Sequence, residues 1–228
     1  MPLAPIELLR QWLTLTLPEA ASRWLETEIS RQSETIDERR LGMALGLVGR
    51  RIGRAAMVVP AEDAAALQDY PGWQPEKWSA DEAARVALLL AAWHNDERAF
   101  VARVERLCRT GELNERIACL KGFAVFPIPA LLLGCARDAA RSSLQPQFEA
   151  IACCNPYPAA QFDSAAFNQM VVKCVFSGVA IETVVGLQER RNPELVRMLV
   201  DLVSERKIAG RSVPDSVHRY LADNVPLE

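Results

Sequence analysis

Apolar residues recur every three or four positions along most of the chain, the spacing that places them on one face of an α-helix. No stretch of the sequence shows the strict alternation or the β-branched enrichment that is typical of strands. We therefore expect an all-α protein of about ten helices joined by short loops, with more than about 60% helix. The expected architecture is an α-solenoid-like (HEAT-like) array or an irregular helical bundle.

Residues that start and stop helices divide this pattern into segments. Ser79 followed by Glu82 predicts a capping box, and Asn95 is expected to cap the next helix. Asp163 is expected to cap the helix that runs to Ser177, and Asn192 with Pro193 begins a long helix near the end of the chain. The expected helices cover about 18–30, 36–54, 80–93, 95–110, 112–121, 130–142, 146–154, 163–177 and 193–209.

The segments are expected to form a single helical domain over residues 1–228. Within it, residues 1–70 supply N-terminal helices, 79–154 helical hairpins and 155–228 a distinct C-terminal region. The segment 70–78, which holds two prolines, a glycine and two tryptophans, is the longest expected loop.

Composition excludes several classes of function. A net charge of −3 with intermixed signs gives no field that would recruit nucleic acid or an anionic membrane. The longest uncharged run, 122–136, is shorter than the roughly 20 residues needed to span a bilayer. The six cysteines lack CxxC spacing and indicate reduced core thiols, and the N-terminus lacks the pattern of a signal peptide. We therefore expect a cytoplasmic protein without a membrane span.

No cofactor or metal is expected from the sequence. Its two histidines, His94 and His218, belong to no ligand motif, and His94 is expected in a turn between helices. GxGxxG, P-loop and GxSxG sequences do not occur. The sequence therefore names no catalytic residue.

A stripe of glycines marks the helix expected at 36–54. Gly42, Gly46, Gly49 and Gly53 fall on one narrow face and together cost about 4 kcal/mol of helix stability relative to alanine. Close contact with a neighbouring helix would offset that cost, so Gly46→Leu should destabilise the fold by overpacking. A groove for a flat or chain-like apolar ligand is the alternative.

The helix expected at 163–177 carries polar residues among apolar ones. Gln169, Lys173 and Ser177 form a polar strip, and Asn168 lies alone between apolar neighbours. A buried lysine must be paired or deprotonated. Lys173 therefore has either a structural partner, a carboxylate or loop carbonyls, or a role in binding an anionic or carbonyl-bearing ligand.

The helix expected at 193–209 places Arg206 on its apolar face, where an arginine needs a partner. Arg197, Asp201 and Glu205 follow one another in steps of four on the flank, which favours ion pairing. We expect Arg206 and Lys173 to meet buried partners near residues 155–158. As the alternative, Asp201 and Glu205 form a carboxylate pair for acid–base or metal chemistry.

These C-terminal residues resemble the signature of the EboA family. The matching stretches are Asn155-Pro156-Tyr157-Pro158, the Phe167-Asn168-Gln169-Met170-Val171-Val172-Lys173 run, Gly186-Leu187, Arg190 with Asn192, Arg197-Met198-Leu199, Glu205-Arg206 and Ala209-Gly210-Arg211. The resemblance covers about a quarter of the chain. It implies a helical protein encoded beside a prenyltransferase-like membrane protein, a metal-dependent hydrolase-like protein and sugar-phosphate-enzyme-like proteins, which support traffic of a bacterial secondary metabolite toward the periplasm.

The resemblance and the polar strips together give the expected function. We expect an accessory or scaffold protein of that traffic pathway, which binds a protein of the same gene cluster or a small apolar metabolite. The alternative is an enzyme acting on a prenylated or aromatic intermediate, with Lys173, Asp201 and Glu205 in one pocket. The candidate binding residues are Asn155, Tyr157, Asn168, Gln169, Lys173, Arg190, Asn192, Arg197, Asp201, Glu205, Arg206 and Arg211.

Overall fold

The computed structural model describes residues 3–224, and helices make up 70% of the chain. In these residues there are thirteen α-helices, four short 3-10 helices and no strand, apart from an isolated bridge between Ala56 and Ser79. The prediction of an all-α protein is therefore confirmed. The α-helices are α1 (Pro5–Thr16), α2 (Glu19–Glu34), α3 (Glu38–Arg51), α4 (Ala64–Leu67), α5 (Ala80–Ala91), α6 (Glu97–Thr110), α7 (Leu113–Gly122), α8 (Leu133–Arg141), α9 (Gln145–Ala152), α10 (Tyr157–Gln161), α11 (Ser164–Phe176), α12 (Pro193–Ile208) and α13 (Asp215–Asn224). The 3-10 helices are η1 (Ala61–Asp63), η2 (Pro75–Lys77), η3 (Pro129–Leu132) and η4 (Ile181–Thr183).

The chain forms two compact units, Met1–Cys135 and Ala136–Glu228. The boundary between them falls in α8 and at neither of the breaks considered in the sequence, 70–78 and 154–155. The expectation of one domain with a solenoid-like or bundle arrangement stays a prediction, and each unit is described by itself.

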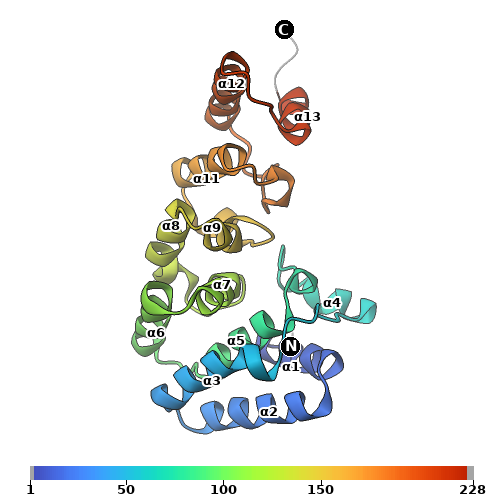
Figure 1. Ribbon diagram of the computed structural model, residues 1–228, viewed down its shortest axis with the longest axis vertical. Helices are drawn as coiled ribbons and strands as arrows, with labels where there is room; N and C mark the ends of the chain where they lie inside the picture. Colours follow the sequence, from blue (N-terminus) through green and yellow to red (C-terminus); the bar gives the residue numbers. More distant parts are fainter. Residues whose placement is uncertain (1–2, 225–228) are drawn as a thin grey trace. The chain divides into compact units, whose positions relative to one another are not determined.

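Helix α5 is the centre of the first unit and contacts α1, α2, α3 and α7 (Figure 1). Its sequence is rich in alanine and leucine, and ten of its twelve residues are buried. Because alanine side chains are small, helices can approach α5 from several sides. The predicted capping box holds its first turn, where the Ser79 amide donates to Glu82 Oε2 at 2.9 Å.

The expected loop at 70–78 packs into the first unit through its tryptophans. The Trp73 ring lies 5.5 Å from that of Trp12 on α1 and 5.8 Å from that of Trp78, centroid to centroid. Trp12 Nε1 in turn donates to Asp63 Oδ2 at 2.6 Å. Buried aromatic pairs of this kind stabilise beyond their area. The loop is thus part of the core of the first unit.

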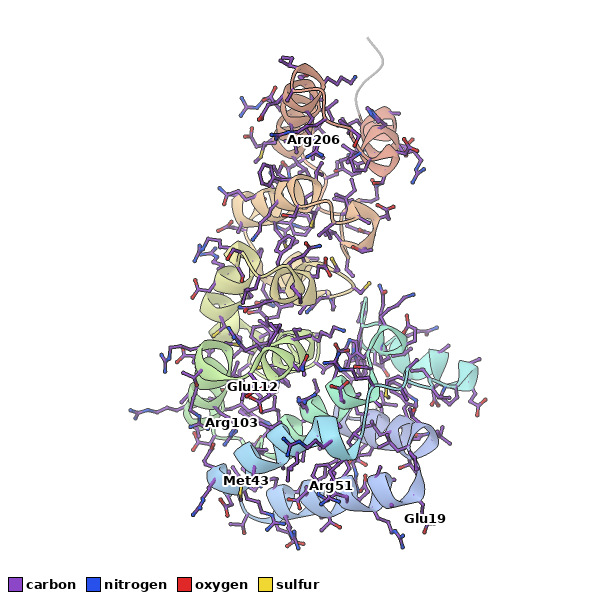
Figure 2. All side chains as sticks on the ribbon, viewed as in Figure 1. Glu19, Met43, Arg51, Arg103, Glu112 and Arg206 are labelled. Carbon is purple, nitrogen blue, oxygen red and sulfur yellow. The ribbon has the colours of Figure 1, made fainter. Side chains whose placement is uncertain are left out.

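A charged bridge joins α3 to α6 within the first unit. The Arg103 side chain is only 2% exposed, and its Nε and Nη2 donate to Glu38 Oε1 at 3.0 and 2.6 Å (Figure 2 labels Arg103). Its Nη1 donates to the Ala92 carbonyl at 3.0 Å, and Arg106 donates to the other Glu38 oxygen. Burial alone would raise the pKa of Glu38, but the hydrogen bonds from Arg103 and Arg106 lower it.

The turn between α5 and α6 corrects one predicted cap. Asn95 has a left-handed backbone, with φ of 57°, and the cap of α6 is Asp96, whose Oδ1 accepts from the Ala99 amide at 3.0 Å. Asparagine tolerates this conformation better than most residues, so the chain turns at Asn95 and Asp96 takes the cap position of α6. His94 lies in the turn, as expected, and its Nε2 meets the Gln32 carbonyl oxygen at 2.7 Å.

The glycine stripe of α3 does not face a neighbouring helix, so that prediction is wrong. The buried face of α3 is formed by Leu41, Ala44, Leu45 and Val48. A Cβ at Gly42 or Gly53 would meet nothing within 4 Å, and those at Gly46 and Gly49 would meet only the tips of Glu115 and Arg85, at 3.7 and 3.5 Å. Met43 and Arg51, labelled in Figure 2, are exposed on the same helix. The overpacking expected of Gly46→Leu therefore has no physical basis.

Helix α11 is central to the second unit, where it contacts α9, α12 and η4. Its buried residues include Phe167, Val171 and Cys174. Helix α12 contacts α13, which the sequence did not predict. Val217, Tyr220 and Leu221 are buried on α13, and three apolar positions in ten residues are too short a pattern to identify a helix.

All six cysteines are free thiols, as predicted. Cys119 and Cys174 are buried and the other four are half-buried. Desolvation raises the pKa of Cys174 to about 12, so its thiol stays protonated near neutral pH. The two buried sulfurs, Cys119 and Cys174, therefore act as small apolar groups in the core.

Candidate functional site

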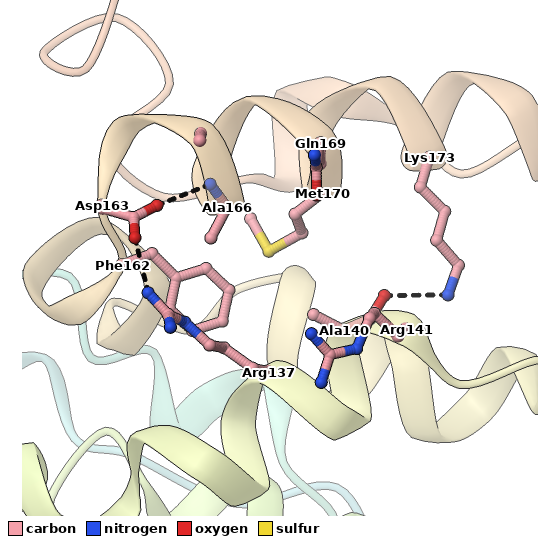
Figure 3. Close-up of a pocket in the computed structure, with 10 residues that line it drawn as sticks. Arg137, Ala140, Arg141, Phe162, Asp163, Ala166, Gln169, Met170 and Lys173 are labelled. Carbon is pink, nitrogen blue, oxygen red and sulfur yellow. Dashed lines mark hydrogen bonds and ion pairs between the residues drawn. The ribbon is translucent and has the colours of Figure 1, made fainter.

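A groove of about 490 Å³ lies between α8 and α11 in the second unit (Figure 3). This volume is in the range of small-molecule sites. Arg137 and Asp163 are at one end of the groove and Lys173 is at the other, with Met170 between them. The lining residues are Arg137, Ala140, Arg141, Phe162, Asp163, Ala165, Ala166, Gln169, Met170 and Lys173.

Asp163 fixes one end of the groove through two roles. As predicted, it caps α11, since its Oδ1 accepts from the Ala166 amide at 2.8 Å. Its Oδ2 accepts from Arg137 Nη2 at 2.5 Å, which ties α8 to the start of α11. Arg137 Nε is buried and has no hydrogen-bond partner among the described residues. One donor of this guanidinium is thus buried without a partner in the described part of the chain.

Lys173 fixes the other end of the groove. Its ammonium donates to the Ala140 and Ser142 carbonyls at 2.8 and 2.6 Å and lies 4.3 Å from the centroid of the Phe148 ring. Backbone carbonyls were the partners that the sequence allowed, but these two belong to the last turn of α8 and the residue after it, not to residues 155–158, so that placement was wrong. Desolvation lowers the pKa of Lys173. No carboxylate forms an ion pair with it in the part of the chain that the structure describes.

Gln169 and Arg141 add polar groups to the rim of the groove. Gln169 is exposed one turn before Lys173, as the predicted polar strip requires. Arg141 donates to Asp138 Oδ1 at 2.7 Å, and this pair is exposed, at 70% and 78% for the two side chains. Exposed pairs are worth about 0–1 kcal/mol, so Arg141 can exchange its partner at little cost.

The NPYP turn holds the backbone and does not line the groove. Asn155 is buried; its Nδ2 donates to the Ala150 carbonyl at 3.0 Å, and its Oδ1 accepts from the Tyr157 amide at 3.0 Å. Tyr157 is buried and stacks edge-on against Phe162, with ring centroids 6.5 Å apart. These two candidates are therefore structural residues, and neither lines the groove.

Asn168, Asn192 and Arg190 form a second structural group, which links α11 to the start of α12. Asn168 and Asn192 exchange amide hydrogen bonds at 3.0 and 2.9 Å, and Asn192 Oδ1 also caps α12 by accepting from the Leu195 amide. Arg190 donates to the Ala159 and Phe162 carbonyls at 2.6 and 2.8 Å, and its guanidinium carbon lies 4.9 Å from the centroid of the Phe167 ring. The isolated Asn168 thus has its partner on another helix.

The candidates on α12 do not join the groove. Arg197 pairs with Glu194 at 2.7 Å rather than with Asp201, and Asp201 and Glu205 are exposed and absent from the lining. Arg206 Nε donates to the Ser212 carbonyl at 2.9 Å, at the end of its own helix (Figure 2). The buried partner near 155–158 was therefore a wrong prediction for Arg206. Arg211 is exposed after the helix.

Sequence reasoning missed Arg137, Arg141, Phe162 and Met170 as lining residues. Arg137 and Arg141 are four positions apart and so share one side of α8, which is the signal that could have identified them. Met170 and Phe162 read as core residues, and they are buried while also facing the groove.

Comparison with known families adds the context for this site. A family model described as "Metabolite traffic protein EboA" matches residues 5–222. The chain belongs to the EboA family. The match extends over the N-terminal helices, well beyond the C-terminal quarter that carried the resemblance in the sequence. No curated protein and no solved structure matches the chain.

Two further properties of this EboA-family chain concern metal ions and membranes. Within residues 3–224, no three histidine, cysteine, aspartate or glutamate side chains are grouped so that they could hold a metal ion. In the same residues no helix has the length and hydropathy needed to span a membrane.

Proposed function

We propose that this EboA-family protein serves metabolite traffic in the cytoplasm by holding a pathway intermediate in the groove between α8 and α11, without converting it. The observation that carries the proposal is the groove itself, which combines an apolar wall with cationic side chains. Such a combination of apolar lining and few polar groups is typical of small-molecule sites. The family description suggests that the ligand is a metabolite. The free thiols support a reducing compartment such as the cytoplasm.

Binding is favoured over catalysis because the ionisable groups of the groove already have partners. Lys173 donates to two carbonyls, Asp163 caps α11 and accepts from Arg137, and Arg141 pairs with Asp138. A general base or nucleophile needs a group within reach of the reacting atom and available to it. The enzyme hypothesis requires Lys173, Asp201 and Glu205 together, and only Lys173 lines the groove.

Proteins of the same gene cluster are the proposed donors and acceptors of the intermediate. A protein that carries a ligand without changing it must receive it from one partner and deliver it to another. We therefore expect a cluster partner to bind the chain more tightly when the intermediate is present, because ligand and partner binding are then coupled.

Capture from cells that express the whole cluster tests the proposal. The wild-type chain and an Ala166→Trp variant, whose indole would occupy the groove, are purified and weighed by native mass spectrometry. We expect an added small-molecule mass on the wild type that the variant lacks, with equal thermal midpoints for both. The mass should be unchanged after prolonged incubation. A product of different mass would instead support the enzyme, and partner capture without any bound small molecule would support a scaffold.

A further inference from the structure

The groove between α8 and α11 has an excess of positive charge on its lining. Three cations, Arg137, Arg141 and Lys173, face it with a single carboxylate, Asp163, so that the lining residues sum to a charge of +2. Asp163 is already engaged by Arg137 and by the first turn of α11. The whole chain has a net charge of −3, so this excess is local to the groove.

Lys173 is the cation that most needs a counter-ion. Its ammonium is desolvated and bonded to two neutral carbonyls, which orient its charge without cancelling it. A partly buried charge without an opposite charge is costly, and an anion beside it would recover that cost. Arg141 lines the same groove, and it directly follows Ala140, whose carbonyl accepts from Lys173.

The rest of the groove is suited to an apolar group. Met170 lies between the two ends of the groove, and Phe162 lies beside Arg137 and Asp163 (Figure 3). Ala140 and Ala166 leave room between the two helices because their side chains are small. A hydrocarbon or ring system placed there would lose contact with water on both sides.

We propose that the groove is selective for an amphipathic anion, whose carboxylate, sulfonate or phosphate lies at Lys173 and Arg141 and whose apolar body lies against Met170 and Phe162. This inference rests on the proposed function and specifies its ligand class. Arg141 leaves its exposed pair with Asp138 to meet the anion, and Arg137 stays with Asp163 at the far end.

A series of ligands with one chain length and different head groups tests the selectivity. Decanoate, 1-decanol and decyltrimethylammonium are titrated into the wild-type protein, each below its aggregation threshold, and their Kd values are measured by calorimetry or by NMR. We expect decanoate to bind about tenfold more tightly than decanol, the ratio that one charge-assisted hydrogen bond supplies. Decyltrimethylammonium should bind most weakly.

Three variants, one of them a control, locate the bound ligand. Arg141→Gln should weaken decanoate binding severalfold and leave decanol binding unchanged. Arg197→Gln is the matched control, because Arg197 is also in an i,i+3 pair of the second unit and is 69% exposed against 70% for Arg141. Ala166→Trp should abolish binding of all three ligands, with circular dichroism confirming that the variant is folded.

Each outcome separates this inference from the proposed function. The selectivity would be overturned if the three ligands bound equally, if the cation bound most tightly, or if none of them bound. It would also be overturned if decanoate still bound to Ala166→Trp. An intermediate captured from cells in a groove-dependent way would still support the proposed function in those cases. Conversely, selective decanoate binding with no captured intermediate would uphold the anion site and count against the role in traffic.

Discussion

Asn168 on α11 and Asn192 at the start of α12 form a reciprocal amide pair, in which each side chain donates to the other, at 3.0 and 2.9 Å. Asn168 is buried and Asn192 half-buried, and the pair joins two helices that are separated by the segment 177–192. Asn192 also donates to the Arg190 carbonyl at 3.1 Å and accepts from the Leu195 amide, so all four of its hydrogen-bonding positions are used.

Asn192→Ala should destabilise the fold by about 2–4 kcal/mol, since it removes an N-cap and leaves a buried amide without its partner. Asn168→Ala should cost less, because the cap remains. A double-mutant cycle by urea denaturation should give a coupling energy of about 1–2 kcal/mol between the two residues. Asn114→Ala, an exposed control, should stay within about 0.5 kcal/mol of the wild type. Additive effects at 168 and 192 would contradict the pair.

Arg190→Ala should lower the free energy of unfolding by about 2–3 kcal/mol. The guanidinium satisfies the carbonyls of Ala159 in α10 and of Phe162 directly after it, and hydrogen bonds from charged donors are the stronger kind. Arg197→Ala is the comparison, and should change stability by no more than about 0.5 kcal/mol because its pair with Glu194 is exposed. Chemical denaturation of both variants measures the difference, and equal effects would show that Arg190 is not a structural residue.

Gly42→Ala should stabilise the protein by about 0.5–1 kcal/mol. Gly42 is in the interior of α3, it is exposed, and an added Cβ meets nothing within 4 Å, so alanine gains helix propensity without a clash. Gly53→Ala serves as the control from the same stripe and should destabilise by about 1–2 kcal/mol, since φ is 75° there. We expect the thermal midpoint to rise in Gly42→Ala and to fall in Gly53→Ala. A loss of stability in both variants would instead indicate that the stripe is closely packed.

The Glu38–Arg103 contact should make the free energy of unfolding of the first unit depend on pH in the acidic range. Because the pKa of Glu38 in the folded protein is below its ordinary value of 4.5, the folded state binds its proton later than the unfolded state as pH falls. The stabilisation is therefore complete above about pH 4.5 and is lost as pH falls through the lowered pKa. The difference in unfolding free energy between wild type and Glu38→Gln, measured from pH 7 to pH 2.5, should decrease in that window. A constant difference would show that Glu38 does not titrate with folding.

Local chemistry explains which predictions from the sequence were confirmed. Helical spacing gave the fold class, and the caps at Ser79, Asp163 and Asn192 were correct because a cap needs only residues three positions away. The cap at Asn95 was wrong because two neighbouring residues can both cap, and only the turn geometry selects Asp96. The short helix α13 was missed since its apolar pattern covers too few residues.

The amino-acid sequence by itself determined the helical class, the family signature and the need of Lys173 and Asn168 for partners, because those depend on spacing along the chain and on the cost of burying polar groups. Only the tertiary structure decided which partners they have. Lys173 meets carbonyls at the end of α8 rather than in the NPYP turn, Asn168 meets Asn192, and the glycine stripe faces no neighbouring helix. The physical reason is that helices packed around a core bring together side chains about 24 to 33 positions apart, and the periodicity of one helix does not specify which face of another it will meet.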